Sequence, residues 1–452
     1  MLLMTLMTSP LIKTVQPNKR AKKKVLYIVH NHPSVIPGGA EIHALELYEA
    51  MRQSDEYEPQ LLSRRGPSSG GNRPGTRLSL VGQDTQQSFF FTDPAEIDFF
   101  YMSARDKSIY TIHFREFLET YRPDVIHIQH TLFLGFDLLR MIKNLLPATP
   151  IIYTLHEYIP ICHRSGQMVR TINSENCMEE SPRRCNQCFP EISPQDFFMR
   201  KRFIQAQFAL VDLFLAPCHF LLDRFTDWGI PPEKIVFEDY GRALLPRAIE
   251  APEAEKRSRN RFAFFGQINE FKGVDVLIKA MKILAESDDA CDAHLWVHGA
   301  NLEIQRIEFQ NEFRELLAAT SQNVTMAGRY RSEEVPKLMA KIDWVVVPSI
   351  WWENSPLVIQ EAFHNRRPIV CSDIGGMAEK VRDGVDGLHF RARDPISLAS
   401  VIRRATNTEG LWKNLQDGIP DVYKVDDQVT NLTAIYNSLI ATKQSNAESY
   451  AE

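Results

Sequence analysis

The sequence predicts an α/β protein in which two doubly wound domains face each other across a cleft. Three observations lead to this fold class. The chain has 452 residues, which is more than one hydrophobic core normally accommodates. Short apolar segments alternate with helix-periodic segments through both halves, as expected for parallel sheets covered by helices. A charged, proline-containing stretch at residues 246–260 separates the two halves and has the composition of an interdomain linker.

The first half begins after a basic leader, residues 1–23, which we expect to be disordered. The apolar run Lys24–His30 predicts a buried strand, followed by a glycine-containing turn and a helix through Leu45 and Tyr48. Residues 64–75, rich in Gly, Ser, Pro and Arg, indicate a mobile loop. The N-terminal domain is predicted to span residues 24–245. Its further strands are expected at Asp124–Gln129, Ile151–His156, Leu213–Ala216 and Ile235–Phe237.

The same alternation starts again after the linker and predicts a second Rossmann-like domain over residues 261–425. The strand Arg261–Gly266 leads into a helix with apolar residues at 3–4 spacing from Val274 to Leu284. A final helix is predicted in residues 426–445, from the periodicity of Val429–Ile440. The other strands of this domain are expected at His294–Val297, Asn323–Met326, Trp344–Val347 and Pro368–Cys371.

The stretch Trp351–Ala362 is the most informative motif of the chain. It follows the buried strand Trp344–Val347, and Pro356 is suited to the first position of a helix, with one of the two residues before it as the cap. Glu353 is then expected in the loop at the carboxyl end of the strand, and Glu361 about two turns into the helix. Ligands bind at that edge of an α/β sheet, and a helix N-terminus favours a phosphate. The motif therefore predicts one carboxylate beside a phosphate site and a second within reach of sugar hydroxyls.

This pair resembles the Glu-x7-Glu signature of retaining glycosyltransferases with the GT-B fold, group 1/family 4. The resemblance implies that Glu353 contacts the donor sugar and that Glu361 binds the ribose of the nucleotide. A pair of surface carboxylates without function is the alternative reading of the two residues alone. The residues between them that the resemblance places at the donor are Asn354, Ser355, Pro356 and Leu357.

The segment from Gly266 to Gly273 resembles the Gly-Arg-x4-Lys-Gly element of the same family. In that element, the Arg and the Lys hold the donor diphosphate and offset the charge that develops as the nucleotide leaves. Lys272 matches the pattern, whereas Gln267 replaces the expected Arg and brings no charge. We expect shifted phosphate contacts or impaired use of the donor. Arg329 or Arg331 is the candidate for the missing charge, and an exposed Arg is the alternative at both positions.

Three further positions match the family. Gly38 and Gly39 follow the first strand, where the absence of a Cβ lets backbone approach a phosphate or a sugar. His156 ends its strand and is expected at the reaction centre as a positioning or charge-stabilising group. The loop Gly375–Glu379 matches a Gly-Gly-x-x-Glu element whose glycines are expected near the donor. A plain turn is the alternative for the two glycines after the first strand, and a structural histidine is the alternative for His156.

Four of the seven cysteines form a cluster between residues 162 and 188, in what resembles a Cys-rich insertion of some family members. A C-x-x-C turn can place two thiolates on one metal ion, and two more cysteines complete a tetrahedral set. Disulfides are disfavoured in a cytoplasmic protein. Structural zinc and plain reduced thiols remain the two open readings, and no catalytic metal is expected. The four residues are Cys162, Cys177, Cys185 and Cys188.

Composition narrows the function further. The chain has 44% hydrophobic and 24% charged residues, as in soluble globular proteins. Its net charge of −5 gives no support for nucleic-acid binding. No apolar run has transmembrane length, so we expect a cytoplasmic protein. The basic and aromatic segment Phe197–Phe203 predicts a helix with a charged face; peripheral contact with the inner face of the membrane is the second reading.

Together, the motifs and the resemblance predict a retaining glycosyltransferase. It would move a sugar from a UDP-, GDP- or ADP-sugar to a glycan, lipid-linked or small-molecule acceptor, as in cell-envelope polysaccharide synthesis. The catalytic residues would be His156, Lys272 and Glu353. A sugar-nucleotide epimerase of the same fold, or a non-catalytic scaffold that binds proteins, are the alternatives. Neither the donor, the acceptor nor the oligomeric state follows from the sequence.

Overall fold

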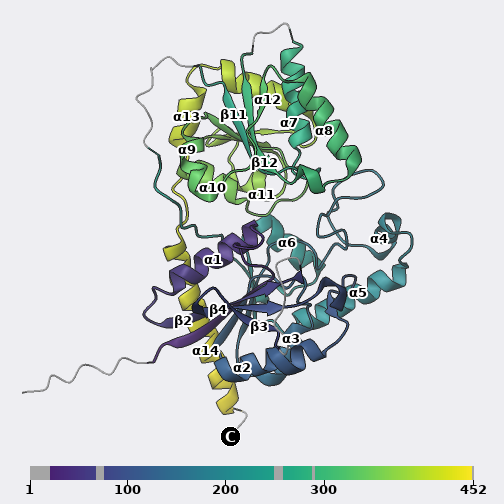
Figure 1. Cartoon of the computed structure of the whole chain (residues 1–452), viewed down its shortest axis with the longest axis vertical. Helices are drawn as coiled ribbons and strands as arrows, with labels where there is room; N and C mark the ends of the chain where they lie inside the picture. Colours follow the sequence, from purple (N-terminus) through teal and green to yellow (C-terminus); the bar gives the residue numbers. More distant parts are fainter. Residues whose placement is uncertain (1–20, 68–75, 249–257, 288–290, 450–452) are drawn as a thin grey trace, which may run out of the picture.

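The computed structural model has two α/β domains stacked along its long axis, with the C-terminal domain drawn above the N-terminal one (Figure 1). It describes residues 21–67, 76–248, 258–287 and 291–449. The two doubly wound domains predicted from the sequence are confirmed. Most of the predicted leader and most of the predicted linker lie outside the described residues, although Lys23 already belongs to the first strand. Among the described helices, none is both long and apolar enough to cross a membrane.

The N-terminal domain contains an eight-stranded sheet with the order β10-β9-β8-β7-β1-β2-β4-β3. All neighbouring strands are parallel except the edge pair β3–β4. The strands are β1 (Lys23–Val29), β2 (Tyr57–Arg65), β3 (Leu78–Val81), β4 (Asp84–Phe91), β7 (Val125–Ile128), β8 (Ile151–Thr154), β9 (Leu213–Ala216) and β10 (Ile235–Phe237), with a separate hairpin of β5 (Ile97–Asp98) and β6 (Ser103–Ala104).

Helices cover this sheet on both faces, as the crossovers between parallel strands require. The short helix α4, which contains two of the four clustered cysteines, and the longer α5 extend to one side (Figure 1). The helices of the domain are α1 (Gly39–Met51), α2 (Arg115–Tyr121), α3 (Leu138–Leu145), α4 (Pro182–Cys188), α5 (Pro194–Phe208) and α6 (His219–Trp228).

The C-terminal domain has a six-stranded parallel sheet with the order β13-β12-β11-β14-β15-β16. Its strands are β11 (Arg261–Gln267), β12 (His294–Ala300), β13 (Val324–Met326), β14 (Trp344–Val347), β15 (Ile369–Ser372) and β16 (Gly387–Phe390). Its helices are α7 (Val274–Ala285), α8 (Ile307–Ala319), α9 (Val335–Met339), α10 (Leu357–His364), α11 (Gly375–Lys380), α12 (Pro395–Asn407) and α13 (Leu411–Gly418).

Each sheet has a switch point, where the chain changes direction of winding. In the N-terminal sheet it lies between β1 and β7, and in the C-terminal sheet between β11 and β14. Loops diverge from the carboxyl ends of the two strands at such a point and leave a crevice for a ligand. The loops after β11 and β14 are the two segments that contain Lys272 and Glu353. Fold topology therefore brings two predicted site loops together.

The last helix, α14 (Val425–Ser449), leaves the upper domain and runs down the side of the lower one (Figure 1). Its Leu432 and Tyr436 are fully buried in a core shared with Val25, Tyr27 and other residues of the N-terminal domain. The helix is longer than the periodicity of residues 429–440 indicates. The C-terminal helix therefore packs onto the N-terminal domain.

The sequence prediction was wrong about the region after α1. Arg64 and Arg65 were expected in a mobile loop, but they end strand β2, and residues 68–75 lie outside the described residues. Arg64 is buried, donates hydrogen bonds to Thr92 and stacks on the ring of Phe133. The predicted helix at Phe197–Phe203 is part of α5, but its Arg200 is buried and donates to three backbone carbonyls rather than facing solvent.

Candidate active site between the two domains

The loop after β11 holds Lys272 against the loop after β14. Gly273, which precedes α7, has a φ of +65°, and a Cβ at this position would lie 1.9 Å from the carbonyl oxygen of Pro348. Only glycine combines this backbone conformation with such close contact. The contact sets the position of the preceding residue, and Lys272 Nζ lies 2.6 Å from Glu353 Oε1. A cation and a carboxylate thus meet at the switch point of the C-terminal sheet.

Glu353 is fixed by three donors on one oxygen. Its Oε1 accepts hydrogen bonds from Ser349 Oγ at 2.7 Å and Trp351 Nε1 at 2.8 Å, in addition to the contact with Lys272. The residue is buried. These bonds and the ion pair keep a buried carboxylate in one orientation, as a group that binds a sugar hydroxyl requires. The structure therefore unites Lys272 and Glu353, two of the three residues predicted to be catalytic.

The helix that follows begins one residue later than predicted. Pro356 occupies the cap position of α10, which starts at Leu357, so that Glu361 lies about one turn into the helix rather than two. Neither predicted capping side chain caps the helix, because each is used elsewhere. Asn354 Nδ2 donates to the carbonyl oxygen of His156 across the domain boundary, and Ser355 Oγ donates to Asp239 Oδ1 at 2.9 Å.

Glu361 is held by a residue that the sequence analysis did not identify. Arg242 Nη2 lies 3.2 Å from Glu361 Oε1, and the same guanidinium group binds both carboxylate oxygens of Glu46 on α1 at 2.9 and 3.2 Å. Burial raises the pKa of Glu361 above its ordinary value, and the charge of Arg242 offsets this only in part. Arg242 thereby links α1 of one domain to α10 of the other.

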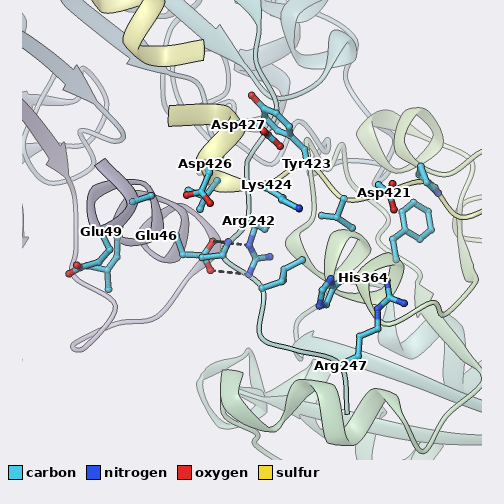
Figure 2. Close-up of a pocket in the computed structure, with 18 residues that line it drawn as sticks. Glu46, Glu49, Arg242, Arg247, His364, Asp421, Tyr423, Lys424, Asp426 and Asp427 are labelled. Atoms are coloured by element: carbon cyan, nitrogen blue, oxygen red, sulfur yellow. Dashed lines mark hydrogen bonds and ion pairs between the residues drawn. The ribbon is translucent and has the colours of Figure 1, made fainter. Parts of the chain in front are cut away.

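Arg242 lies beside a cavity of about 1080 Å³ between the domains. Figure 2 shows its guanidinium directed at Glu46, with His364 on one side of the cavity and Lys424 on the other. The backbone of Arg242 is paired with the returning chain through Tyr423 and Val425. The two segments that connect the domains therefore run side by side here, and the cavity lies next to them. We call this connection, around Arg242 and Tyr423–Val425, the hinge. A smaller cavity of about 70 Å³ includes Glu361 and Arg242 in its lining.

Gly38 and Gly39 face this arrangement from the N-terminal domain. A Cβ on Gly39 would lie 3.8 Å from Leu357 at the start of α10, and one on Gly38 would lie 2.5 Å from Glu41 Oε2. Glu41 is buried and pairs with His30 Nε2 at 3.0 Å. Burial alone would raise the pKa of Glu41, but the hydrogen bond and charge of His30 outweigh it and lower that pKa. The predicted glycine turn of the N-terminal domain thus lies opposite Leu357 of the C-terminal domain.

His156 lies just beyond β8, where it was predicted, but both of its ring nitrogens are occupied. Nε2 lies 3.0 Å from Gln129 Oε1, and Nδ1 lies 2.6 Å from the hydroxyl of Tyr240. Burial, followed by the charges of neighbouring histidines, puts the pKa of His156 well below its usual range, so the ring is neutral. In this structure the ring contacts protein groups, and its backbone carbonyl joins the two domains through Asn354.

The loop at Gly375–Glu379 packs between the Glu353 loop and α6. A Cβ on Gly376 would lie 1.5 Å from the carbonyl oxygen of Asn354, and Gly376 N donates to Glu353 O at 2.7 Å. Glu379 accepts hydrogen bonds from the backbone of His219 and Phe220 at the N-terminus of α6. The glycines therefore pack against the backbone of the Glu353 loop, and Glu379 caps a helix of the other domain.

The charge expected in place of Arg at position 267 is not brought to the Lys272–Glu353 pair. Gln267 is exposed at the end of β11, after Gly266 with its φ of +151°. Arg329 pairs with Glu303 at 2.5 Å, and Arg331 pairs with Glu334 at 3.6 Å. Both arginines are largely exposed. Neither arginine replaces the missing charge in this structure.

The Cys-rich insertion, which belongs to the N-terminal domain, also contacts the C-terminal domain. Trp352 Nε1, next to Glu353, donates to Cys177 O at 2.8 Å, which docks the insertion on the donor-side loop. All the described cysteines are free thiols, and burial raises the pKa of Cys162, Cys177 and Cys185. Within the described ranges, no three His, Cys, Asp or Glu side chains are placed to share a metal ion. The structural zinc that the spacing suggests for Cys162, Cys177, Cys185 and Cys188 stays a prediction.

Comparisons with known families agree with this geometry. Residues 37–237 match the family model described as Glycosyltransferase Family 4, and residues 259–408 match the model described as Glycosyl transferases group 1. The chain is 29% identical over 242 residues to D-inositol 3-phosphate glycosyltransferase from Salinispora arenicola, which covers 49% of this chain and 52% of that protein. The chain thus matches about half the length of this relative.

Solved structures share the fold over nearly the full chain. Anabaena HepE in complex with UDP and glucose has a TM-score of 0.60 at 16% identity, covering 92% of this chain and 100% of that one. Sucrose-phosphate synthase from Thermosynechococcus elongatus has a TM-score of 0.65 at 14% identity, covering 93% and 100%. The architecture of two facing Rossmann-like domains is therefore the GT-B fold.

Proposed function

We propose that this protein, an enzyme built from the domains of a group 1, family 4 glycosyltransferase, transfers a sugar from a nucleotide donor to an acceptor hydroxyl with retention of configuration. The observation that carries the proposal is the Lys272–Glu353 pair at the β11–β14 switch point, with Nζ and Oε1 2.6 Å apart. Glu361 follows in the same segment, about one turn into helix α10. This spacing suits a donor whose sugar meets Glu353, whose diphosphate meets Lys272 and whose ribose meets Glu361.

Each residue has a role that its surroundings support. Lys272 supplies a positive charge where negative charge develops on the departing diphosphate. Glu353, with three donors on its Oε1, has Oε2 with which to accept a hydrogen bond from a hydroxyl of the donor sugar. Glu361 binds the ribose hydroxyls once the donor competes with Arg242 for its carboxylate. His156 and Gly39 lie at the N-terminal side of the cleft, where the acceptor would enter.

The chemistry is a substitution at the anomeric carbon. The bond from the anomeric carbon to the diphosphate oxygen breaks, and a bond to the acceptor oxygen forms on the same face. The acceptor proton passes to the leaving diphosphate, so that no protein base is needed. Enclosure between the domains excludes water, which would otherwise hydrolyse the donor.

A UDP-sugar is the first donor to test. HepE was solved with UDP and with UDP-glucose, and starch synthase IV from Arabidopsis thaliana with ADP and acarbose. A glycan or a lipid-linked sugar is the proposed acceptor class. Phe198 and Met199 of α5 are each 54% exposed, which suits peripheral contact with a membrane that presents such an acceptor.

Calorimetric titration with UDP-, GDP- and ADP-sugars tests the proposal. The wild-type protein is expected to bind one donor, and Glu361→Ala is expected to weaken that binding by at least about tenfold, since a charged hydrogen bond to ribose contributes about 1.5–3 kcal/mol. Glu286→Ala is the matched control. Glu286 is an exposed carboxylate at the C-terminal end of α7, whereas Lys272 lies just before the N-terminal end of that helix. Absence of binding across the panel by the folded protein would favour the non-catalytic scaffold.

A further inference from the structure

A chain of buried polar groups connects α14 to the donor-side loop. Tyr436 hydroxyl lies 2.6 Å from His127 Nδ1, and His127 Nε2 lies 3.0 Å from Gln129 Nε2. Gln129 Oε1 then meets His156 Nε2 at 3.0 Å, and His156 Nδ1 meets the Tyr240 hydroxyl at 2.6 Å. The chain ends at Asn354, whose Nδ2 lies 3.5 Å from that hydroxyl. It crosses from the N-terminal domain, through the hinge-side residue Tyr240, into the C-terminal domain.

The direction of every hydrogen bond in this chain is fixed from the Asn354 end. The carbonyl oxygen of His156 can only accept, so the amide nitrogen of Asn354 must face it. The same nitrogen donates to the Tyr240 oxygen, which leaves the Tyr240 proton for His156 Nδ1. His156 must then carry its own proton on Nε2 and donate it to Gln129 Oε1. Reversal of the chain would leave the Tyr240 hydroxyl proton without an acceptor.

The same direction continues to the opposite end of the chain of hydrogen bonds. With Oε1 of Gln129 facing His156, its amide nitrogen donates to His127 Nε2. His127 therefore carries its proton on Nδ1 and donates it to the Tyr436 hydroxyl. Each ring is neutral, as expected for imidazoles buried away from carboxylates. Gln129 thus passes the direction set at the Asn354 end from His156 on to His127.

We propose that Gln129 and Tyr240 are positioning residues for sugar transfer: they hold His156 as the neutral Nε2–H tautomer and place the Asn354 end of the Glu353 loop against the N-terminal domain. The inference rests on the proposed function for its effect on catalysis. Asn354 directly follows Glu353, so a shift of the Asn354 amide moves the carboxylate that meets the donor sugar. Misplacement of a reacting group by about 1 Å can cost as much as 100-fold in rate.

The tautomer is measured first, by nitrogen-15 NMR of the histidine side chains in the full-length protein. His156→Gln assigns the signal among the 13 histidines. The wild type is expected to show His156 protonated on Nε2 alone at neutral pH, and Tyr240→Phe, which removes the donor to Nδ1, is expected to give a mixture of tautomers. A His156 that is protonated on Nδ1, or doubly protonated, in the wild type would overturn the proposal. This measurement needs no substrate.

Kinetics of donor hydrolysis then separate positioning from stability. Gln129→Met and Tyr240→Phe are each expected to lower kcat by at least about tenfold, with the donor Kd changed by less than about threefold, because neither residue is among those proposed to bind the donor. The double variant is expected to be no slower than the slower single variant, since both break one chain. Tyr153→Phe is the matched control; it removes a buried tyrosine hydrogen bond to Thr131 in the loop after β7, 3.0 Å long, which is not part of this chain of hydrogen bonds.

The outcomes distinguish the possible failures. Loss of thermal stability without loss of kcat, as expected for Tyr153→Phe, would show that Gln129 and Tyr240 are merely structural and overturn the inference. A wild-type protein that binds no donor and hydrolyses none removes the proposed function and the catalytic part of this inference together. The tautomer result identifies which of the two has failed, because it depends on the geometry alone.

Discussion

The charge on Glu361 depends on Arg242, which is 4% exposed and bridges two carboxylates. Removal of the guanidinium in Arg242→Met leaves Glu361 half-buried without its cation. We expect the pKa of Glu361 to rise further, which weakens donor binding at neutral pH because less of the carboxylate is ionised. Because ribose binding needs the carboxylate, affinity is lost as the pH falls through the raised pKa and is regained above it.

Calorimetry between pH 6 and pH 9 measures this effect. Arg247→Met serves as the control, since Arg247 lines the same cavity but is exposed. Equal donor affinity for Arg242→Met and the wild type at every pH would contradict the assignment of Arg242 to Glu361.

Glu157 makes stability depend on pH. Burial raises the pKa of Glu157 to about 8, with only partial compensation from the Ile159 amide and Arg200. The folded protein therefore keeps this proton up to about pH 8, whereas the unfolded chain loses it near its ordinary pKa of roughly 4.3. The unfolding free energy is expected to fall by about 1–3 kcal/mol as the pH rises through that window.

Glu157→Gln removes the titrating proton but keeps the shape of the side chain. The variant is expected to lose less stability than the wild type between pH 5 and pH 8, as measured by urea unfolding at each pH. Parallel stability curves for the two proteins would mean that Glu157 is ionised in the folded state at neutral pH.

The loop after β11 depends on a glycine that no other residue replaces. Gly273 and Gly410 both have positive φ, +65° and +75°, but only Gly273 has a backbone atom where a Cβ would lie. We expect Gly410→Ala to cost about 1 kcal/mol from backbone strain and Gly273→Ala about 3 kcal/mol, since the second also displaces Pro348.

Donor binding separates the two variants more sharply than stability does. Gly273→Ala shifts Lys272 away from Glu353 and is expected to abolish measurable donor binding, whereas Gly410→Ala should leave it unchanged. Similar donor affinities for both variants would contradict the view that the Gly273–Pro348 contact positions Lys272.

The strands that the sequence revealed are those whose burial is visible in a run of apolar residues, such as Trp344–Val347. Strands β2 and β4 escaped detection because their buried residues include polar ones. Gln60 on β2 donates to Ser88 on β4, and Gln87 on β4 binds His32. These partners lie 28 and 55 positions apart, so no pattern among neighbouring residues indicates that the polar groups have hydrogen-bond partners.

The same reasoning explains the candidate site. Lys272 and Glu353 were predictable because each lies in a recognisable loop at a strand end. Arg242 was not, because its partners Glu46 and Glu361 lie 196 and 119 positions away and only the hinge brings them together. The caps expected from Asn354 and Ser355 failed for a related reason: the other domain offered these side chains better partners.

The two domains are held together by α14 as well as by the hinge. Leu432 and Tyr436 of α14 are fully buried against the N-terminal domain. Leu432→Ala is expected to lower the unfolding free energy by about 2–4 kcal/mol through the cavity it creates, whereas Ser438→Ala on the exposed face should change it by less than about 0.5 kcal/mol. Denaturant unfolding measures both.

A loss for Leu432→Ala no greater than for Ser438→Ala would contradict the docking of α14 on the lower domain. The docking also places Tyr436 at the end of the hydrogen-bonded chain that leads to Asn354. Stability of the first domain and the position of the donor-side loop are therefore expected to change together when α14 is weakened.

Retention of configuration can be measured in the slow hydrolysis of a bound α-linked nucleotide sugar, followed by proton NMR. Water replaces the unknown acceptor, so the anomer released first reports the stereochemistry. For a retaining transferase we expect free nucleoside diphosphate together with the α-anomer, and a loss of at least about 100-fold in rate for Lys272→Met. Release of the β-anomer, release of an epimerised sugar, or an equal rate for Lys272→Met would contradict it.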